Sequence, residues 1–159
     1  MEMRLLLAIA TKLNVIPKQG NVSQAFVQSV LPDNKKYVCR PPAGCPLTPK
    51  NCYWQLLKTL YGLKRSPLCW YDAATKILKE IGFCQSPHAP CIFVGTLAKN
   101  QAPVYLGLYV DGFLFFRQSP QMEKKFMSQF GAKIKCTFLD KIDYFLGLKF
   151  KNKKMPKEM

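Results

Sequence analysis

One carboxylate stands at a point of the sequence where chemistry could be placed, in the dipeptide Asp111-Gly112. It separates two runs rich in apolar and aromatic residues, 104–110 and 113–117. Asp-Gly between such runs predicts a hairpin with a two-residue turn, because glycine tolerates positive φ. An aspartate in a hairpin most often serves only the turn itself. A functional role for Asp111 therefore depends on the residues that the fold brings near it.

The seven cysteines form neither a disulfide framework nor a strong metal motif. Their number is odd and their spacing irregular. The two closest groups, within residues 39–52 and 84–91, lack the Cys-x2-Cys pairs typical of zinc sites. We therefore expect reduced thiols, as in an intracellular protein.

The composition excludes several classes of protein and indicates a partner. The 159 residues include 24 Lys and Arg against 9 Asp and Glu, which gives a formal charge of +15. Hydrophobic residues make up 48%, too many for a disordered tail, and the length suits one domain. No apolar run approaches the roughly 20 residues of a membrane helix, and the short run at 5–10 predicts a helix rather than a signal peptide. The charge favours a polyanionic partner, most simply nucleic acid.

The order of the expected helices and strands, which must position Asp111 and its neighbours, predicts an α+β fold. One helix is well delimited by Ser66 as N-cap, Pro67 at its first position and Gly82 at its end. Pro17 argues against a regular central strand nearby, since proline cannot donate to a sheet. Helices are expected at 3–14, 23–29, 67–81 and 120–129, and strands or extended segments at 15–22, 37–40, 91–94, 104–110, 113–117, 134–138 and 144–150. This order predicts an antiparallel sheet with helices packed on one face, formed by residues 1–150 and followed by a basic tail at 151–159.

Five blocks of the sequence resemble the motifs of a known protein family. They read RLLLAIA at 4–10, NVSQAF at 21–26, TLYGLKRSP at 59–67 with Trp70-Tyr71 after it, YVDG at 109–112, and YFLGL at 144–148. The order and the amino-acid sequences of these blocks resemble those of Ty1/copia-type retrotransposon reverse transcriptases, which are RNA-directed DNA polymerases. The last four blocks there read D-V-x-x-A-F, S-L-Y-G-L-K-Q-A-P…W, Y-V-D-D and F-L-G-[IL]. The resemblance covers about residues 3–150.

This resemblance implies the palm of a polymerase that uses Mg²⁺. In the family, three aspartates hold two ions, one from D-V-x-x-A-F and two from Y-V-D-D. One ion lowers the pKa of the primer 3′-hydroxyl and the other neutralises the leaving pyrophosphate, at a separation of about 4 Å. Hard Mg²⁺ prefers carboxylate oxygens.

The sequence departs from the family pattern at these positions. Asn21 replaces the first aspartate and Gly112 replaces the second aspartate of the box, so Asp111 is the remaining metal-binding and catalytic aspartate. Three formal negative charges fall to one, and we expect that Mg²⁺ is not bound as a pair. Leu68 stands where the family commonly has arginine, and we expect fingers and thumb to be missing.

A second set of residues is expected to contact nucleic acid. The resemblance implies this role for Tyr61, Gly62, Lys64, Arg65 and Tyr109. Gly62 would let the backbone at Tyr61 approach a ligand closely, whereas the two basic residues could equally solvate the start of a helix. The expected partner is an RNA/DNA duplex or hybrid, bound weakly and without sequence preference.

Four interpretations follow. The first is an active reverse transcriptase, which needs carboxylates that this chain lacks. The second, which we favour, is a truncated and catalytically degraded palm. The third is a non-catalytic nucleic-acid-binding module re-used from a retroelement, and the fourth is a translated pseudogene that does not fold well. We expect an intracellular location, without a membrane or a disulfide partner.

Overall fold

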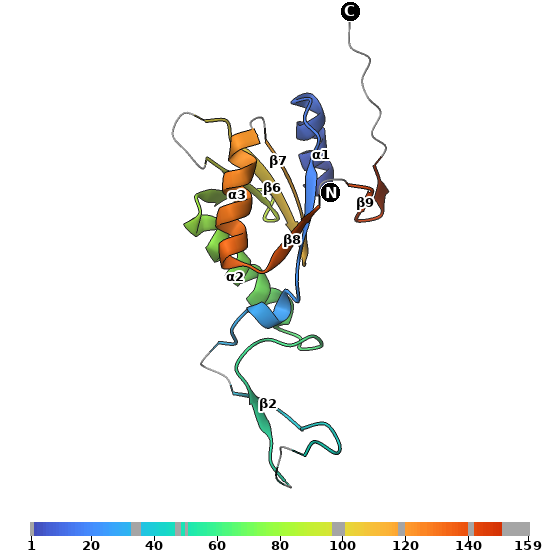
Figure 1. Ribbon diagram of the computed structural model, residues 1–159, viewed down its shortest axis with the longest axis vertical. Coiled ribbons are helices and arrows are strands. Elements are labelled where there is room, and N and C mark those ends of the chain that lie inside the picture. Colours follow the sequence, from blue (N-terminus) through green and yellow to red (C-terminus); the bar gives the residue numbers. More distant parts are fainter. Residues whose placement is uncertain are drawn as a thin grey trace, which may run out of the picture.

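A six-stranded antiparallel sheet forms the centre of the molecule (Figure 1). The computed structural model describes residues 2–32, 36–46, 49, 51–96, 101–117, 120–139 and 142–150. In spatial order the strands are β4 (Phe83–Gln85), β5 (Ile92–Gly95), β6 (Val104–Tyr109), β7 (Gly112–Phe116), β1 (Lys18–Val22) and β8 (Cys136–Leu139). The predicted α+β class with an antiparallel sheet is confirmed. The predicted tail at 151–159 lies outside the described residues.

Helices cover both faces of this sheet. α2 (Ser66–Glu80) and α3 (Pro120–Lys133) pack on one face, and α1 (Glu2–Lys12) packs on the other. A Cβ at Gly107 of β6 would lie 2.6 Å from the sulfur of Met3, so this glycine lets α1 approach the sheet closely. The prediction that all helices lie on one face is therefore wrong for α1. The reason is visible in β7, whose sequence GFLFF has no polar face that water could solvate.

The core between the sheet and α3 is built around Phe113. Its ring meets those of Phe130 and Phe138 edge to face, with centroids 5.3 and 5.7 Å away. The same ring lies over Gly20 in the neighbouring strand β1, where an added Cβ would come within 2.1 Å of it. Edge-to-face rings and close packing of this kind contribute stability beyond the area they bury. Phe113 and Gly20 therefore fasten β7 to β1.

Three local predictions need correction. β1 is an interior strand, because Pro17 precedes its first paired residue, Lys18, and removes no ladder hydrogen bond. Residues 144–150 form two short strands, β9 (Tyr144–Phe145) and β10 (Leu148–Lys149), instead of one. Leu146 and Gly147 make the turn between them with positive φ, 49° and 77°. The segment at 23–29 contains only a short 3-10 helix, η1 (Phe26–Gln28).

A second, two-stranded sheet extends away from the main sheet (Figure 1). It pairs β2 (Tyr37–Cys39) with β3 (Trp54–Leu56), of which the second was not predicted. All seven cysteines are free thiols. In the described part of the chain, no helix is long and apolar enough to cross a membrane.

An ion pair network joins the start of β1 to α3. The Glu123 carboxylate accepts hydrogen bonds from Lys18, at 2.7 Å, and from Arg117. Burial raises the pKa of Glu123, but the hydrogen bonds from both cations outweigh it and bring the pKa below the ordinary 4.5. The charged carboxylate is thus the form that the fold stabilises.

We expect Glu123→Gln to lower the free energy of unfolding by about 2 kcal/mol at pH 7, because it removes hydrogen bonds between charged groups. Since the folded-state pKa lies below the unfolded one, this stabilisation is complete above pH 4.5 and is lost as pH falls through the folded-state pKa. Urea unfolding at neutral and acidic pH measures both effects. Glu80→Gln is the matched control, because the pair of Glu80 with Lys133 is exposed and should change little. Equal stability of the two variants at pH 7 would contradict this prediction.

Candidate functional site

The pairing of β1 with β7 brings the three predicted metal positions together. Asn21 of β1 lies directly opposite Gly112 of β7, and Asp111 precedes Gly112 in the chain. The next opposite residue, Val22, donates its N–H to the carbonyl of Asp111 at 2.7 Å. Asn21 and Gly112 are then a pair without mutual hydrogen bonds, the kind in which side chains come closest. The sequence motifs of residues 21–26 and 109–112 therefore meet at one end of the sheet.

The hairpin turn lies one residue earlier than the sequence predicted. Tyr109 pairs with Gly112, so the two turn residues are Val110 and Asp111, and Gly112 is the first residue of β7. Val110 has φ 54°, an uncommon value for a β-branched residue. Such a conformation costs about 1–3 kcal/mol and persists only where surrounding contacts impose it.

Trp70 of α2 supplies one of those contacts. Its indole N–H donates to the carbonyl of Val110 at 2.5 Å, and the side chain is buried in the core. Its predicted place in the core is confirmed. Its role in holding the turn that carries Asp111 could not be read from sequence spacing, because α2 and the hairpin are 40 residues apart.

Gly112 faces Phe145 of the hairpin β9–β10. A Cβ added there would lie 3.1 Å from the Phe145 ring, a close contact with the edge of a side chain. The φ of Gly112 lies outside the left-handed region. A Cβ at this position therefore requires Phe145 to move by a few tenths of an ångström.

The side chains at this site do not fit a pair of divalent cations. Asp111 contributes one carboxylate, Asn21 an uncharged amide and Gly112 no donor beyond the backbone. Among the described residues, no group of three or more His, Cys, Asp or Glu side chains could hold a metal ion. Two Mg²⁺ ions about 4 Å apart need several carboxylates to offset their mutual repulsion. The strand pairing brings these three positions together, but among their side chains only that of Asp111 is a carboxylate.

An apolar cavity of about 290 Å³ adjoins the turn. It lies between β6, α2 and η1. Its lining includes Phe26, Trp70, Tyr71, Tyr109 and Val110. Tyr109 and Val110 are both exposed, and the expected contact of Tyr109 with nucleic acid requires this exposure.

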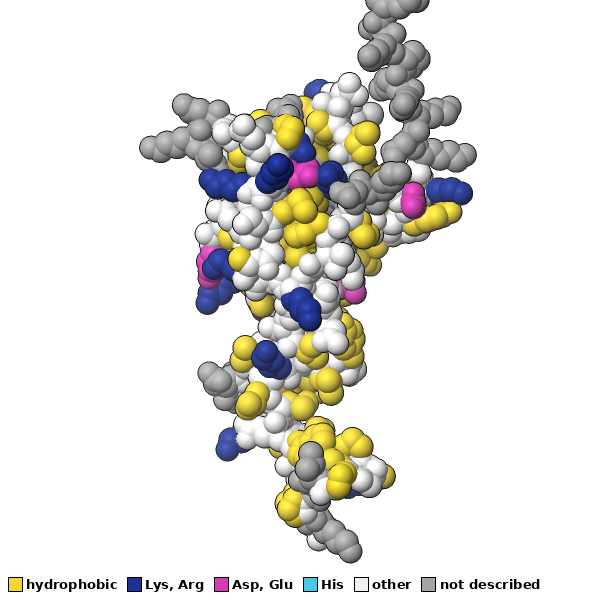
Figure 2. Space-filling model, in the orientation of Figure 1, with side chains coloured by type: hydrophobic (Ala, Val, Ile, Leu, Met, Phe, Trp, Pro, Cys, Tyr) yellow, Lys and Arg dark blue, Asp and Glu magenta, His cyan; other side chains and the backbone are white. Residues whose placement is uncertain are grey.

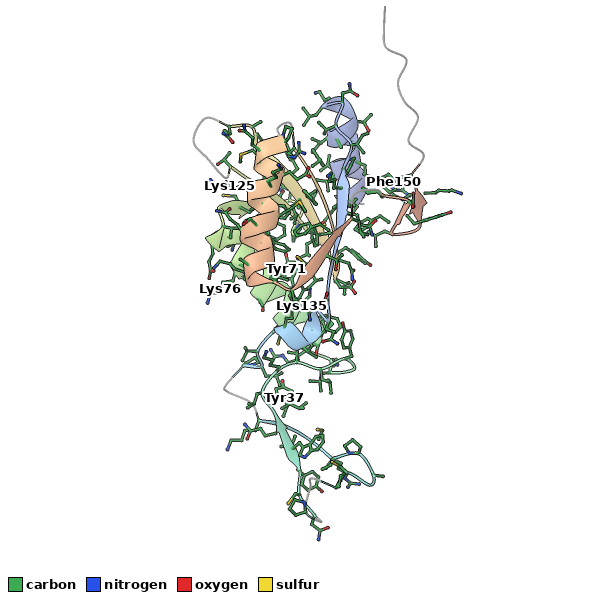
Figure 3. The ribbon with its side chains drawn as sticks, in the orientation of Figure 1. Tyr37, Tyr71, Lys76, Lys125, Lys135 and Phe150 are labelled. Carbon is green, nitrogen blue, oxygen red and sulfur yellow. The ribbon has the colours of Figure 1, made fainter. Side chains whose placement is uncertain are left out.

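The cysteine thiol and the tyrosine hydroxyl beside this cavity have raised pKa values, so neither is activated as a nucleophile. Burial raises the pKa of the Cys91 thiol to about 12, and the hydrogen bond from its Sγ to the Glu2 carboxylate, 2.6 Å long, acts in the same direction. Burial also raises the pKa of Tyr71 on α2 (Figure 3), whose hydroxyl donates to the carbonyl of Pro90 at 2.8 Å. These groups serve packing and hydrogen bonding, since a reactive thiol needs a lowered pKa.

The segment before α2 carries the other predicted contacts with nucleic acid. Tyr61 is exposed and packs against Phe26, with ring centroids 4.8 Å apart. Gly62 has φ 90° with open space around it, so this turn requires glycine. Lys64 and Arg65 are exposed at the entrance of α2. Phe26, which sequence reasoning did not select, thus joins Tyr61 to the cavity beside the hairpin; its place within the NVSQAF block was the available signal.

Buried hydroxyl groups hold this segment in place. Thr59 shares a hydrogen bond of 2.8 Å with Ser29 and donates to the carbonyl of Phe26. Ser66 was predicted as the N-cap of α2, but it lies within the first turn, and its hydroxyl donates to the carbonyl of Leu60 at 2.6 Å. The hydroxyls of Thr59 and Ser66 thus hold the turn at 60–65 beside η1.

Gln28 fixes the other side of η1. Its side-chain amide donates to the carbonyl of Lys135 at 3.0 Å and accepts from the Lys135 N–H at 2.9 Å. Gln28 therefore joins the segment after β1 to the start of β8.

Known proteins resemble this chain in sequence over most of its length. The family model described as reverse transcriptase (RNA-dependent DNA polymerase) matches residues 1–156. The putative transposon Ty5-1 protein of Saccharomyces cerevisiae is 30% identical over 128 residues, which cover 80% of this chain and 41% of that protein. The retrovirus-related Pol polyprotein from transposon RE1 of Arabidopsis thaliana is 30% identical over 148 residues, 93% of this chain and 10% of the polyprotein.

A similar polyprotein from transposon TNT 1-94 of Nicotiana tabacum is 25% identical over 146 residues, 92% of this chain and 11% of its own length. The chain thus spans less than half the length of each of these relatives. No solved structure matches it significantly.

Proposed function

The chain belongs to the reverse transcriptase (RNA-dependent DNA polymerase) family, and we propose that it is a palm-like region of a copia-type retrotransposon polymerase that has lost catalysis. The observation that carries this proposal is the pairing of Asn21 with Gly112 beside the single carboxylate of Asp111. The antiparallel sheet with Asp111 at the tip of its central hairpin supports the palm assignment. A polymerase palm needs the same positions to carry three carboxylates.

The loss of charge is large enough to decide against a metal pair. At a few ångströms from a dication, each lost carboxylate removes several kcal/mol of gross attraction even at an effective dielectric constant of 20. An amide oxygen at Asn21 can ligate Mg²⁺, but it does not offset the repulsion between two ions. We infer that Asp111 alone holds at most one divalent ion, and weakly.

Binding of nucleic acid does not depend on the lost carboxylates. The formal charge of +15 and the exposed Lys64 and Arg65 support it. Lys and Arg side chains are spread over the visible face of the molecule, with few Asp and Glu among them (Figure 2). A second candidate function, a non-catalytic module that binds nucleic acid without sequence preference, is favoured by this charge.

We expect the purified protein to show no primer extension on an RNA template with Mg²⁺. The reason is that the two-metal mechanism lacks two of its three carboxylates. The measurement is incorporation of labelled dNTPs, with Asp111→Asn as the matched variant, expected to behave like the wild type. Template-dependent incorporation that Asp111→Asn abolishes would overturn the proposed loss of catalysis.

We expect weak binding to duplex and hybrid oligonucleotides that depends steeply on salt and not on sequence. If four to six basic residues contact phosphates, raising salt from about 50 to 200 mM weakens binding by roughly two to three decades. Fluorescence anisotropy in a salt series measures this slope. Lys64→Ala with Arg65→Ala should reduce the slope by about 1.8, for two contacts. Lys76→Ala with Lys79→Ala, farther along α2, is the control and should leave the slope unchanged. A slope that is flat, or equal in both double variants, would refute the proposed contact.

A further inference from the structure

The sheet of β2 and β3 has a free edge at β2. This two-stranded sheet extends away from the body of the molecule (Figure 1). Among the described residues, β2 pairs only with β3, so the backbone N–H and C=O groups along its other edge have no partner strand. A sheet of two strands is only marginally stable in water until a third strand joins it or something packs against it. The free edge of β2 is therefore a place where an extended peptide can bind.

The exposed side chains beside this edge lie on one face of the sheet, because side chains alternate between the two faces of a strand. Val38, in the middle of β2, is 62% exposed. Lys36 and Arg40, which directly precede and follow β2, are exposed as well. The residues of β2 on the opposite face, Tyr37 and Cys39, are half-buried. One face thus presents an apolar side chain between two cations.

β3 extends the same face. Gln55 lies opposite Val38 in the register and is exposed. Tyr53 and Leu57, two residues before and after Gln55, are 58% and 73% exposed, whereas Leu56 on the other face is half-buried. Apolar side chains gather at this end of the molecule in the space-filling view (Figure 2). A cluster of exposed apolar side chains with polar neighbours is typical of a protein interaction surface.

The charge of this region determines the class of partner. From residue 34 to residue 71 the sequence has seven Lys or Arg and no Asp or Glu. A second copy of this chain is disfavoured at the edge, because antiparallel pairing of two β2 strands about Val38 would set Lys36 of each beside Arg40 of the other. Like charges directly opposite one another destabilise strand pairing, and opposite charges stabilise it. The two cations therefore favour a strand with acidic residues.

The backbone groups of the edge distinguish a polypeptide from other polyanions. An added strand satisfies the N–H and C=O groups of β2 through a ladder of hydrogen bonds, which is the main source of affinity when a peptide joins a sheet. The backbone of a nucleic acid carries acceptors but no matching donors. It would use the cations alone and leave the C=O groups of the edge unpaired.

We propose that the free edge of β2 binds an acidic polypeptide segment as a third strand. Its acidic side chains lie beside Lys36 and Arg40, and the apolar side chain midway between them lies beside Val38. The matching sequence has Asp or Glu two residues before and two residues after an apolar residue. Because this pattern reads the same in both directions, it holds for parallel and antiparallel pairing alike. The inference goes beyond the proposed function and does not depend on the residues at the hairpin site.

The test uses the full chain labelled with nitrogen-15 and the synthetic peptide Thr-Glu-Thr-Val-Thr-Glu-Thr. An NMR titration reports binding at each backbone amide and measures weak affinities. We expect saturable shifts of the amide signals of β2 and no comparable shifts on α3. Replacement of both glutamates of the peptide by glutamine should weaken binding about fivefold, since pairs of opposite charge across strands are lost.

N-methylation of the peptide separates strand pairing from general electrostatic attraction. In a strand at the edge of a sheet, alternate N–H groups face the neighbouring strand and the others face solvent. Two peptides are therefore made, each methylated at one set of alternate residues. We expect one of them to lose binding and the other to retain most of it.

Charge reversal on the protein supplies the second comparison. Arg40→Glu should weaken binding of the peptide about tenfold, because an attractive pair across strands becomes a repulsive one. Lys76→Glu is the matched control, since Lys76 is an exposed cation on α2 and should leave the affinity unchanged. The amide signals of β2 show whether the sheet still forms in Arg40→Glu, and Lys36→Glu provides a second variant with the same expected effect.

Three results would overturn the inference. They are absence of saturable shifts of the β2 amides at low salt, equal binding of the two methylated peptides, and equal affinities of Arg40→Glu and Lys76→Glu. Two further results would assign the edge to another occupant and overturn it as well. Oligo-dT that shifts the β2 amides as strongly as the peptide would indicate nucleic acid, and shifts of these amides on dilution without peptide would indicate a second copy of the chain.

Discussion

The contact between the ring of Phe113 and the backbone of Gly20 determines where the other residues of the site lie. No side chain fits at Gly20, because its Cβ would come within 2.1 Å of the ring. The contact fixes the register of β1 against β7, and a slip of one residue would turn every side chain of the strand to the other face. With this register, Asn21 lies opposite Gly112 and Val22 binds the carbonyl of Asp111. Rings from α3 and β8 surround Phe113 and hold it in this position.

The contacts that hold the hairpin in place do not depend on the charges of the side chains at the site. The turn keeps Val110 at a positive φ, and the indole of Trp70 still binds its carbonyl. These contacts stabilise the hairpin without requiring carboxylates at residues 21 and 112. Under the proposed function, asparagine and glycine at these two positions therefore remove the metal pair without removing contacts that hold the fold. Under the same proposal, such a chain keeps the residues expected to contact nucleic acid and lacks two of the carboxylates that the chemistry needs.

The sequence predicted the elements better than their arrangement. The central hairpin, α2 and α3, and the proximity of the motifs around Asn21 and Asp111 follow from periodicity and from the family resemblance. The turn was predicted one residue late, because local preference favours Asp-Gly, whereas β1 and Trp70 hold Val110 and Asp111 in the turn. The predicted position of α1 was wrong, because the helical pattern at residues 3–14 carries no information about which face of the sheet the helix covers. Phe26 was missed because its contact with Tyr61 joins segments 35 residues apart.

The central claim is that the hairpin retains the geometry of a two-metal site and lacks its charge. A titration with Mn²⁺, followed by the EPR signal of the free ion, compares the wild type with the double variant Asn21→Asp and Gly112→Asp. In the double variant, the ring of Phe145 must shift by a few tenths of an ångström to accommodate the Cβ of the second aspartate. We expect the wild type to bind no Mn²⁺ tightly, and the double variant to bind two ions with much higher affinity. Tight binding of two ions by the wild type, lost in Asp111→Asn, would contradict the claim, as would a double variant that folds and binds no better than the wild type.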